Sequence, residues 1–164
     1  MLLDVKKLFE QEGEELPFQF EMDLSDIEIS QVYPFISAIQ ISGKVKNIEQ
    51  IVYLTAQADF DFNIPCDRCA DDVRTQYHNT FSHPLIMQMN EEDQDTYILV
   101  QDGKLNLTEL LRADILLALP TKYLCKEDCK GLCPICGVNL NSESCQCKQH
   151  QIDPRLEVLK QLID

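Results

Sequence analysis

A regular alternation of apolar and polar residues is the strongest pattern in the first two thirds of the chain. It runs over residues 18–24 and 39–45, and it is clearest over residues 52–64, where seven apolar side chains alternate strictly with polar ones. A period of two places successive side chains on opposite faces of a strand, so one face is buried and the other meets water. This pattern is typical of an antiparallel sheet.

The clearest strand continues into a second strand with the same period. Val73, Tyr77 and Phe81 resume the alternation after a short interruption. Residues 52–81 therefore predict one long hairpin, with its tip at residues 65–72. The first two of the chain's eight cysteines lie in this tip.

Three other segments show helical spacing. The first is the N-terminus, where the apolar face consists of Leu2, Val5, Leu8 and Phe9. The second begins after Asn106, which can cap the first turn together with Glu109, and it ends before Pro120. The third has Asp153 as its N-cap and Pro154 as its first helical residue. Together these elements predict an α+β fold with a curved or barrel-like antiparallel β-sheet, flanking helices and a cysteine-rich C-terminal segment.

Charge divides the chain into two parts. The whole sequence has 28 acidic and 14 Lys or Arg residues, a formal net charge of −14. Residues 1–106 hold 20 acidic and 7 basic residues, whereas residues 107–164 hold 8 and 7. We therefore expect an acidic β part over residues 1–106 and a nearly neutral part over residues 107–164, packed together as one compact unit.

The composition excludes several classes of protein. With 45% hydrophobic and 26% charged residues, the chain is globular rather than disordered. No apolar run approaches the roughly 20 residues that span a bilayer, and the N-terminus lacks the pattern of a secretory signal. We therefore expect a cytoplasmic protein with no membrane partner. Its acidity argues against a protein that coats nucleic acid, so any RNA contact should be local.

The eight cysteines predict metal binding, because a reducing compartment keeps thiols unpaired. Their number and close spacing match two tetrahedral zinc sites with four thiolates each. In Cys133-Pro134-Ile135-Cys136-Gly137 the proline stiffens a tight turn, and the glycine lets the backbone aim amide groups at the thiolates. The candidate ligands of the two expected zinc ions are Cys66, Cys69, Cys125, Cys129, Cys133, Cys136, Cys145 and Cys147.

Loop closure indicates how these ligands divide. Cys133 and Cys136 close only a short loop with Cys145 and Cys147, which keeps the entropy cost of that group low. The other group then consists of Cys66, Cys69, Cys125 and Cys129. On this grouping, a metal would join the tip of the hairpin to the segment after the second helix.

Other interpretations of these residues stay open. An iron–sulfur cluster also takes four thiolates. Cys66 and Cys69 could form a redox pair in which Arg68 favours the thiolate. His150 could replace one cysteine as a ligand, whereas His78 and His83 fit a hydrogen-bonded surface role. No general base or open metal position typical of a catalytic zinc site is evident.

Basic residues gather around the cysteines and could contact phosphate groups locally. Acidic residues lie among them, so ordinary surface charge is the simpler interpretation. The basic residues are Lys122, Lys126, Lys130, Lys148, Arg155 and Lys160.

Taken together, these motifs resemble the YceD family of large ribosomal RNA subunit accumulation proteins, in the form that carries the full set of cysteines. The resemblance covers most of the chain. It rests on Cys66-Asp67-Arg68-Cys69 after a long strand, Leu116-Leu117-Ala118-Leu119-Pro120, residues 129–137, Asn139-Leu140-Asn141 and Ile152-Asp153-Pro154-Arg155-Leu156. It implies a non-enzymatic factor needed for the accumulation of large-subunit ribosomal RNA.

The acidity of the chain indicates what such a factor would bind. We expect a zinc-stabilised adaptor whose acidic part meets a basic ribosomal protein or a large-subunit assembly intermediate, and no small-molecule substrate. A thiol-based or zinc-responsive redox sensor is the main alternative. A metalloenzyme that acts on RNA is a third hypothesis.

Overall fold

The computed structural model describes residues 1–88 and 97–147. The described chain forms two compact units. The first contains Met1–Ile64 and Arg74–Thr121, and the second contains Pro65–Val73 together with the chain from Lys122 onward. The predicted terminal helix that begins at Asp153 lies outside the described residues.

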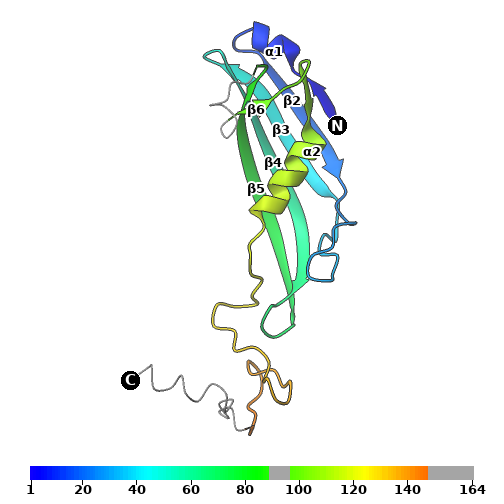
Figure 1. Ribbon diagram of the computed structural model, residues 1–164, viewed down its shortest axis with the longest axis vertical. Helices are drawn as coiled ribbons and strands as arrows, with labels where there is room; N and C mark the ends of the chain where they lie inside the picture. Colours follow the sequence, from blue (N-terminus) through cyan, green and yellow to red (C-terminus); the bar gives the residue numbers. More distant parts are fainter. Residues whose placement is uncertain (89–96, 148–164) are drawn as a thin grey trace, which may run out of the picture. The chain divides into compact units, whose positions relative to one another are not determined.

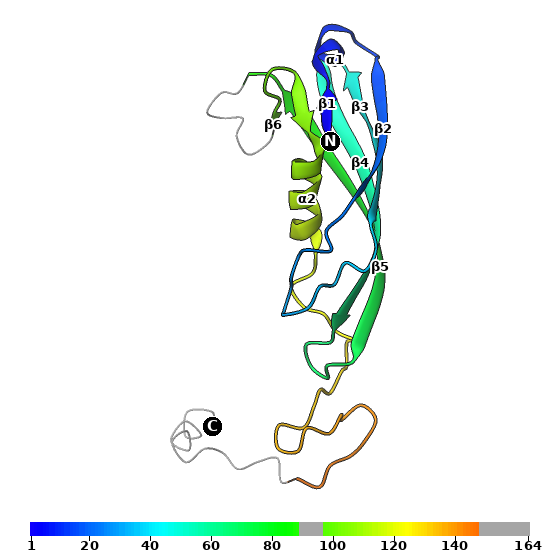
Figure 2. The same ribbon diagram turned by 90° about the vertical axis from the view of Figure 1, so that its right-hand side faces the viewer.

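A five-stranded sheet forms the framework of the first unit (Figure 1). The strands lie side by side in the same order as in the sequence: β2 (Glu15–Met22), β3 (Ile39–Ile48), β4 (Ile51–Pro65), β5 (Asp72–Ile86) and β6 (Ile98–Leu99). β2 pairs antiparallel with β3, and β3 pairs antiparallel with β4, whereas β6 pairs parallel to β5. Because β2 and β6 are separate edges, the sheet is open. The predicted α+β fold with a curved, largely antiparallel sheet is confirmed, and the described strands form an open sheet rather than a closed barrel (Figure 2).

The predicted alternation on β4 is confirmed. One face of this strand is buried, and all seven apolar side chains of that face are at most 3% exposed: Val52, Leu54, Ala56, Ala58, Phe60, Phe62 and Ile64. Each such side chain of the size of Leu or Phe contributes about 1.5–3 kcal/mol through burial. A slip of one residue would turn this whole set toward water, so the pattern sets the register of the sheet.

Gly43 on β3 permits close packing within this core. A Cβ atom there would lie only 2.7 Å from the ring of Phe18 on β2, and it would collide with the backbone carbonyl of Thr55. The missing side chain leaves room for the aromatic ring to cross the strand.

The N-terminus differs from the prediction of a helix that begins at Leu2. Leu2–Asp4 forms strand β1, which pairs antiparallel with β7 (Lys104–Asn106). Only Lys6–Glu10 is helical, as α1, with Leu8 buried. The apolar spacing near Leu2 fits a helix, but backbone hydrogen bonds to a segment about one hundred residues away prevail over this local preference.

The predicted central helix is confirmed as α2 (Leu107–Ala118). Its N-cap Asn106 accepts a hydrogen bond from the Glu109 amide at 3.4 Å, as the capping pattern indicated. Leu107, Leu111 and Ile115 are fully buried. Helix α2 lies over one face of the sheet (Figures 1 and 2). Among the described helices, none has both the length and the apolar composition that a bilayer crossing needs.

The two units do not divide at the charge boundary. Helix α2 belongs to the first unit because its apolar face packs on the sheet, and the hairpin tip at Pro65–Val73 belongs to the second. Strands β4 and β5 therefore enter both units. The boundary at residue 106 separates an acidic part of the sequence from a nearly neutral one. As a boundary between structural parts, it stays a prediction.

Candidate metal centres

The turn between β4 and β5 places two sulfurs on one side of the hairpin tip. Ala70 donates its amide hydrogen to the carbonyl of Cys66 at 2.9 Å, and the Cys66 amide donates to the carbonyl of Asp71 at 2.8 Å. Ala70 has φ = 61°, in the left-handed region. This closed turn brings Cys69 back beside Cys66.

The two residues between these cysteines fasten the tip to the later cysteine segment. The amide of Asp67 donates to the carbonyl of Tyr123 at 2.8 Å, and the Tyr123 amide donates to the Asp67 carboxylate at 2.8 Å. The Arg68 guanidinium donates to the carbonyl of Cys129 at 2.8 Å, and the Arg68 carbonyl accepts from the Leu132 amide at 3.0 Å. Arg68 thus holds the backbone of Cys129, another cysteine of the same group, in place.

These contacts gather the first group of four sulfurs. Its Sγ atoms all lie within 4.8 Å of one another, with Cys66 and Cys129 3.8 Å apart and Cys69 and Cys125 3.5 Å apart. A tetrahedral zinc ion with bonds of about 2.3 Å holds its sulfurs about 3.8 Å apart, so the spacing fits. Of the four residues only Cys125 is exposed.

The second group is built on a small hairpin of its own. The Cys133 amide donates to the Val138 carbonyl at 2.8 Å, and the Gly137 amide donates to the Cys133 carbonyl at 2.8 Å. Gly137 has φ = 74°, which glycine adopts without strain. The four Sγ atoms again lie within 4.8 Å of one another, in the group Cys133, Cys136, Cys145 and Cys147.

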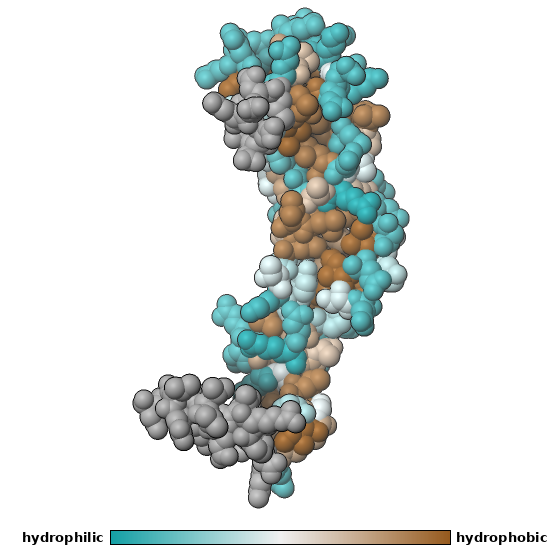
Figure 3. All heavy atoms as spheres, viewed as in Figure 1, coloured by the Kyte–Doolittle hydropathy of each residue, from teal (hydrophilic) through white to brown (hydrophobic). Residues whose placement is uncertain are grey.

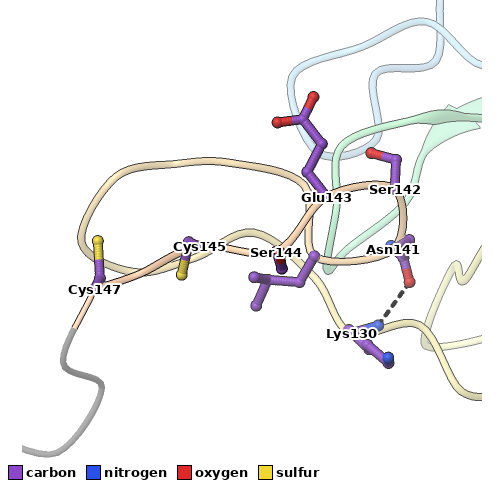
Figure 4. Close-up of a pocket in the computed structure, with 8 residues that line it drawn as sticks. Lys130, Asn141, Ser142, Glu143, Ser144, Cys145 and Cys147 are labelled. Carbon is purple, nitrogen blue, oxygen red and sulfur yellow. Dashed lines mark hydrogen bonds between the residues drawn. The ribbon is translucent and has the colours of Figure 1, made fainter.

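The second group is the more open of the two. Cys133 is buried, Cys136 is exposed, and Cys145 and Cys147 are half-buried. The latter two line a surface hollow of about 510 Å³ beside Lys130 (Figure 4). The structure therefore contains the two groups that loop closure indicated, with different access to solvent.

Backbone amides favour the thiolate form at the first cysteine of each turn. At Cys66, burial opposes ionisation, but hydrogen bonds from the amides of Arg68, Cys125 and Cys69 outweigh it and lower the pKa to about 6. At Cys133, the amides of Cys136 and Ile135 lower the pKa to about 6. Both turns thus direct amide N–H groups at a sulfur, which is the arrangement that stabilises bound thiolates.

Cys147 and Cys69 keep their protons while no metal is bound. The Cys136 side chain, followed by burial, raises the pKa of Cys147 to about 12. At Cys69, the Asp71 amide favours the thiolate, yet burial and the Asp71 carboxylate outweigh it and raise the pKa. Four close sulfurs cannot all ionise without a cation between them, so metal binding must release protons.

Asn141 contacts a sulfur of the first group, a role that the sequence analysis did not assign to it. Its Nδ2 lies 3.3 Å from the Sγ of Cys129, and its Oδ1 accepts from the Lys130 amide at 2.9 Å (Figure 4). Neighbouring Asn139 donates from Nδ2 to the Asp71 carboxylate at 2.9 Å. Two asparagines in a turn between metal-ligand pairs were the available signal.

The remaining candidates lie elsewhere. His78 pairs with Asp59 at 2.7 Å and His83 with Asp114 at 2.8 Å, which fits the expected surface role. His150 lies outside the described residues. Of the basic residues around the cysteines, Lys122, Lys126 and Lys130 are exposed, and the others lie outside the described residues. A phosphate-binding patch therefore stays a prediction.

The donor sets determine what chemistry the two groups support. Four thiols around one position suit a soft or borderline metal ion, such as zinc or iron. A tetrahedral metal bound by all four has no position for a water or substrate. Such centres stabilise the fold around them.

Comparison with known proteins identifies relatives over most of the chain. Residues 54–163 match the family model described as "Large ribosomal RNA subunit accumulation protein YceD". "Uncharacterized protein YlbN" of Bacillus subtilis is 29% identical over 153 residues, which cover 88% of each chain. An uncharacterized protein of Mycobacterium tuberculosis is 29% identical over 129 residues, covering 76% of this chain and 62% of its own. No solved structure matches the chain significantly.

Proposed function

Because the chain belongs to the YceD family, we propose that it is a non-enzymatic, zinc-binding factor that supports the accumulation of large-subunit ribosomal RNA. The family description supports the proposed role in ribosomal RNA accumulation. The pair of four-thiol groups carries the proposal of metal binding. We further propose that the protein acts as an adaptor between the assembling subunit and a basic partner.

Zinc is the metal that we assign to both groups. Each group combines close cysteine turns with amide hydrogen bonds to sulfur, which is typical of structural zinc sites. Zinc would supply the positive charge that lets four thiolates lie together, and the second unit would then fold around it. Metal analysis of the purified protein should find about two zinc ions per chain. Serine in place of Cys66 and Cys69, or of Cys145 and Cys147, should leave about one.

The same measurement distinguishes the competing metal. Iron with sulfide, and a visible absorption band, would replace the zinc assignment with an iron–sulfur cluster. Less than one metal ion per chain after purification under reducing conditions would overturn the metal part of the proposal.

The acidic first unit supports a cationic partner. Hydrophilic side chains gather on the end of this unit that carries α1 (Figure 3). Glu10 at the end of α1 and Glu12, Glu14 and Glu15 after it are all exposed, and of these Glu15 forms an ion pair with Lys44 at 3.1 Å. A surface of this sign attracts basic protein segments and raises their association rate, an effect that salt screens. Ribosomal proteins of the large subunit are the basic partners that the family role indicates.

Affinity purification of the full chain at low salt tests this proposal. We expect large-subunit ribosomal proteins or precursor RNA to be recovered, and to be released as the salt concentration rises. Recovery of no large-subunit component would overturn the proposed function. Recovery that high salt does not reduce would overturn its electrostatic part.

A matched pair of variants locates the surface. Both carry three Glu→Gln changes and the same net charge: one at Glu10, Glu12 and Glu14, the other at the exposed residues Glu21, Glu28 and Glu127. The first should lose most of the bound material, and the second should retain it. Equal losses would show that net charge matters rather than this surface.

A thiol-based sensor is the second candidate, and the access of solvent to the second group favours it. Cys136 is exposed and Cys145 is half-buried, so an oxidant can reach them. Mild peroxide should then release metal from this group and change partner binding reversibly on reduction. Unchanged partner binding after metal release would exclude the sensor role.

A further inference from the structure

Asn141 belongs to the hairpin of the second cysteine group but contacts a sulfur of the first. The hairpin pairs Gly131 with Leu140 through a hydrogen bond of 2.9 Å from the Leu140 amide. This pairing places Asn141 beside Lys130, next to Cys129. The Asn141 Nδ2 lies 3.3 Å from the Cys129 Sγ.

The hydrogen bonds of the Asn141 side chain fix which of its atoms faces the sulfur. Its Oδ1 accepts from the Lys130 amide at 2.9 Å. Its Nδ2 donates to the Asn139 Oδ1 at 2.9 Å and has its second hydrogen for Cys129. The Asn139 Oδ1 also accepts from the Asn141 amide at 3.0 Å. The donor is therefore held toward the sulfur.

A second contact joins the same loop to the hairpin tip. The Asn139 Nδ2 donates to the Asp71 carboxylate at 2.9 Å, and Asp71 lies two residues after Cys69. Both asparagines lie in the loop from Cys136 to Cys145, which joins the two cysteine pairs of the second group. A metal that closes those pairs would order the loop that carries them.

We propose that Asn141 is a positioning residue that couples the two metal groups, so that filling the second group tightens metal binding at the first. This inference rests on the metal binding in the proposed function. The Asn141 donor, 3.3 Å from the Cys129 sulfur, would hydrogen-bond this ligand and hold it in position for the metal. Coupling of binding free energies is reciprocal, so metal at the first group must tighten the second by the same factor.

Cadmium-113 NMR of the full chain tests the coupling, because each four-sulfur group gives its own resonance and the occupancy of each is read separately. Cadmium is titrated against a competing chelator in four chains. These are the natural chain, Asn141→Ala, the chain with Cys145 and Cys147 both changed to Ser, and the combination of all three changes.

We expect the two changes, Asn141→Ala and loss of the second group, to have non-additive effects on the cadmium affinity of the first group. Disabling the second group should weaken cadmium binding at the first about tenfold in the natural chain. Asn141→Ala alone should weaken the first group about as much, and disabling the second group should then add little. Full additivity of the two effects, or an unchanged first group in Asn141→Ala, would overturn the proposal.

Two more variants separate positioning from folding. Asn141→Asp keeps the shape and the acceptor for the Lys130 amide, but it places a carboxylate oxygen at the Cys129 sulfur. It should weaken the first group more than Asn141→Ala does and shift its resonance. Ser142→Ala, in the same loop, should change neither resonance. The resonance of the second group should persist in every chain that keeps its cysteines.

The outcomes also distinguish this inference from the proposed function. Absence of both resonances in the natural chain would contradict metal binding itself. Two resonances without coupling would contradict only the role of Asn141.

Discussion

Ala70 and Gly137 occupy equivalent positions in the two cysteine turns. Each residue follows the second cysteine of its pair, and each donates its amide hydrogen to the carbonyl of the first, at 2.9 Å and 2.8 Å. Their φ angles are 61° and 74°. The two turns thus share one backbone conformation, although only one of them has the glycine that this conformation favours.

Ala70→Gly should stabilise the protein. The left-handed backbone costs alanine about 1 kcal/mol more than glycine, and part of the gain is lost to the greater freedom of glycine in the unfolded chain. We expect the free energy of unfolding of the metal-loaded chain to rise by about 0.5 kcal/mol, measured by urea titration. The control is Ala113→Gly on the exposed side of α2, which should destabilise by about 1 kcal/mol. A loss of stability in both variants would contradict this account of Ala70.

Gly43→Ala should destabilise the first unit. The added methyl group would meet the ring of Phe18 at 2.7 Å and collide with the Thr55 carbonyl, neither of which can move without shifting the sheet. We expect a loss of about 1–3 kcal/mol in urea unfolding, the range for overpacked cores. Ser42→Ala, at the neighbouring exposed position, should change stability by less than about 0.5 kcal/mol. A Gly43→Ala protein as stable as the natural chain would contradict the packing described for β3.

Arg68→Ala should weaken metal binding at the first group more than at the second. The guanidinium holds the carbonyl of Cys129 at 2.8 Å, and its loss frees the backbone that carries this ligand. We expect an affinity about tenfold lower at the first group. Competition with a chelator measures it, and the exposed Arg112→Ala on α2 serves as control. Equal weakening of both groups would indicate general unfolding.

Metal affinity should depend more steeply on pH below about pH 6 than above it. The pKa values of Cys66 and Cys133 are about 6, well below their ordinary 9.0, so above pH 6 both are thiolates before metal arrives. Below pH 6 each must also release a proton on binding. The folded-state preference for these thiolates is present in full above pH 9 and is lost as the pH falls through 6.

Calorimetry in buffers of different ionisation enthalpy measures this effect. We expect about 0.7 more protons released per metal ion at pH 5.5 than at pH 7.5. Cys69 and Cys147, whose pKa values are raised, release theirs at both pH values. Equal proton release at the two pH values would contradict the role of the amide groups at Cys66 and Cys133.

The sequence pattern predicted those features that depend on neighbouring residues. The period of two located β4 because side-chain direction alternates along any strand. The Asn106 cap and the end of α2 before Pro120 follow from hydrogen bonds within one turn of helix. The grouping of Cys133 with Cys147 followed from the short loop between them.

Features that depend on distant residues were not predictable in this way. Leu2 has apolar spacing that fits a helix, yet it lies in β1 because Asn106 offers a paired strand. Asn141 looked like a turn residue, and only the folded hairpin brings it 3.3 Å from Cys129. The open edge of the sheet was also undetermined, because strand periodicity is the same in open and closed sheets.

The sequence by itself determined the buried face of the sheet, the two cysteine turns and the acidic character of the first part, because each is a property of residues adjacent in the chain. The tertiary structure decided which hydrogen bonds hold Cys66 beside Cys129, 63 residues away in the sequence, and that the loop of the second group contacts the first. The physical reason is that covalent spacing limits only local geometry. Contacts between distant segments are selected by the packing and hydrogen bonding of the whole folded chain.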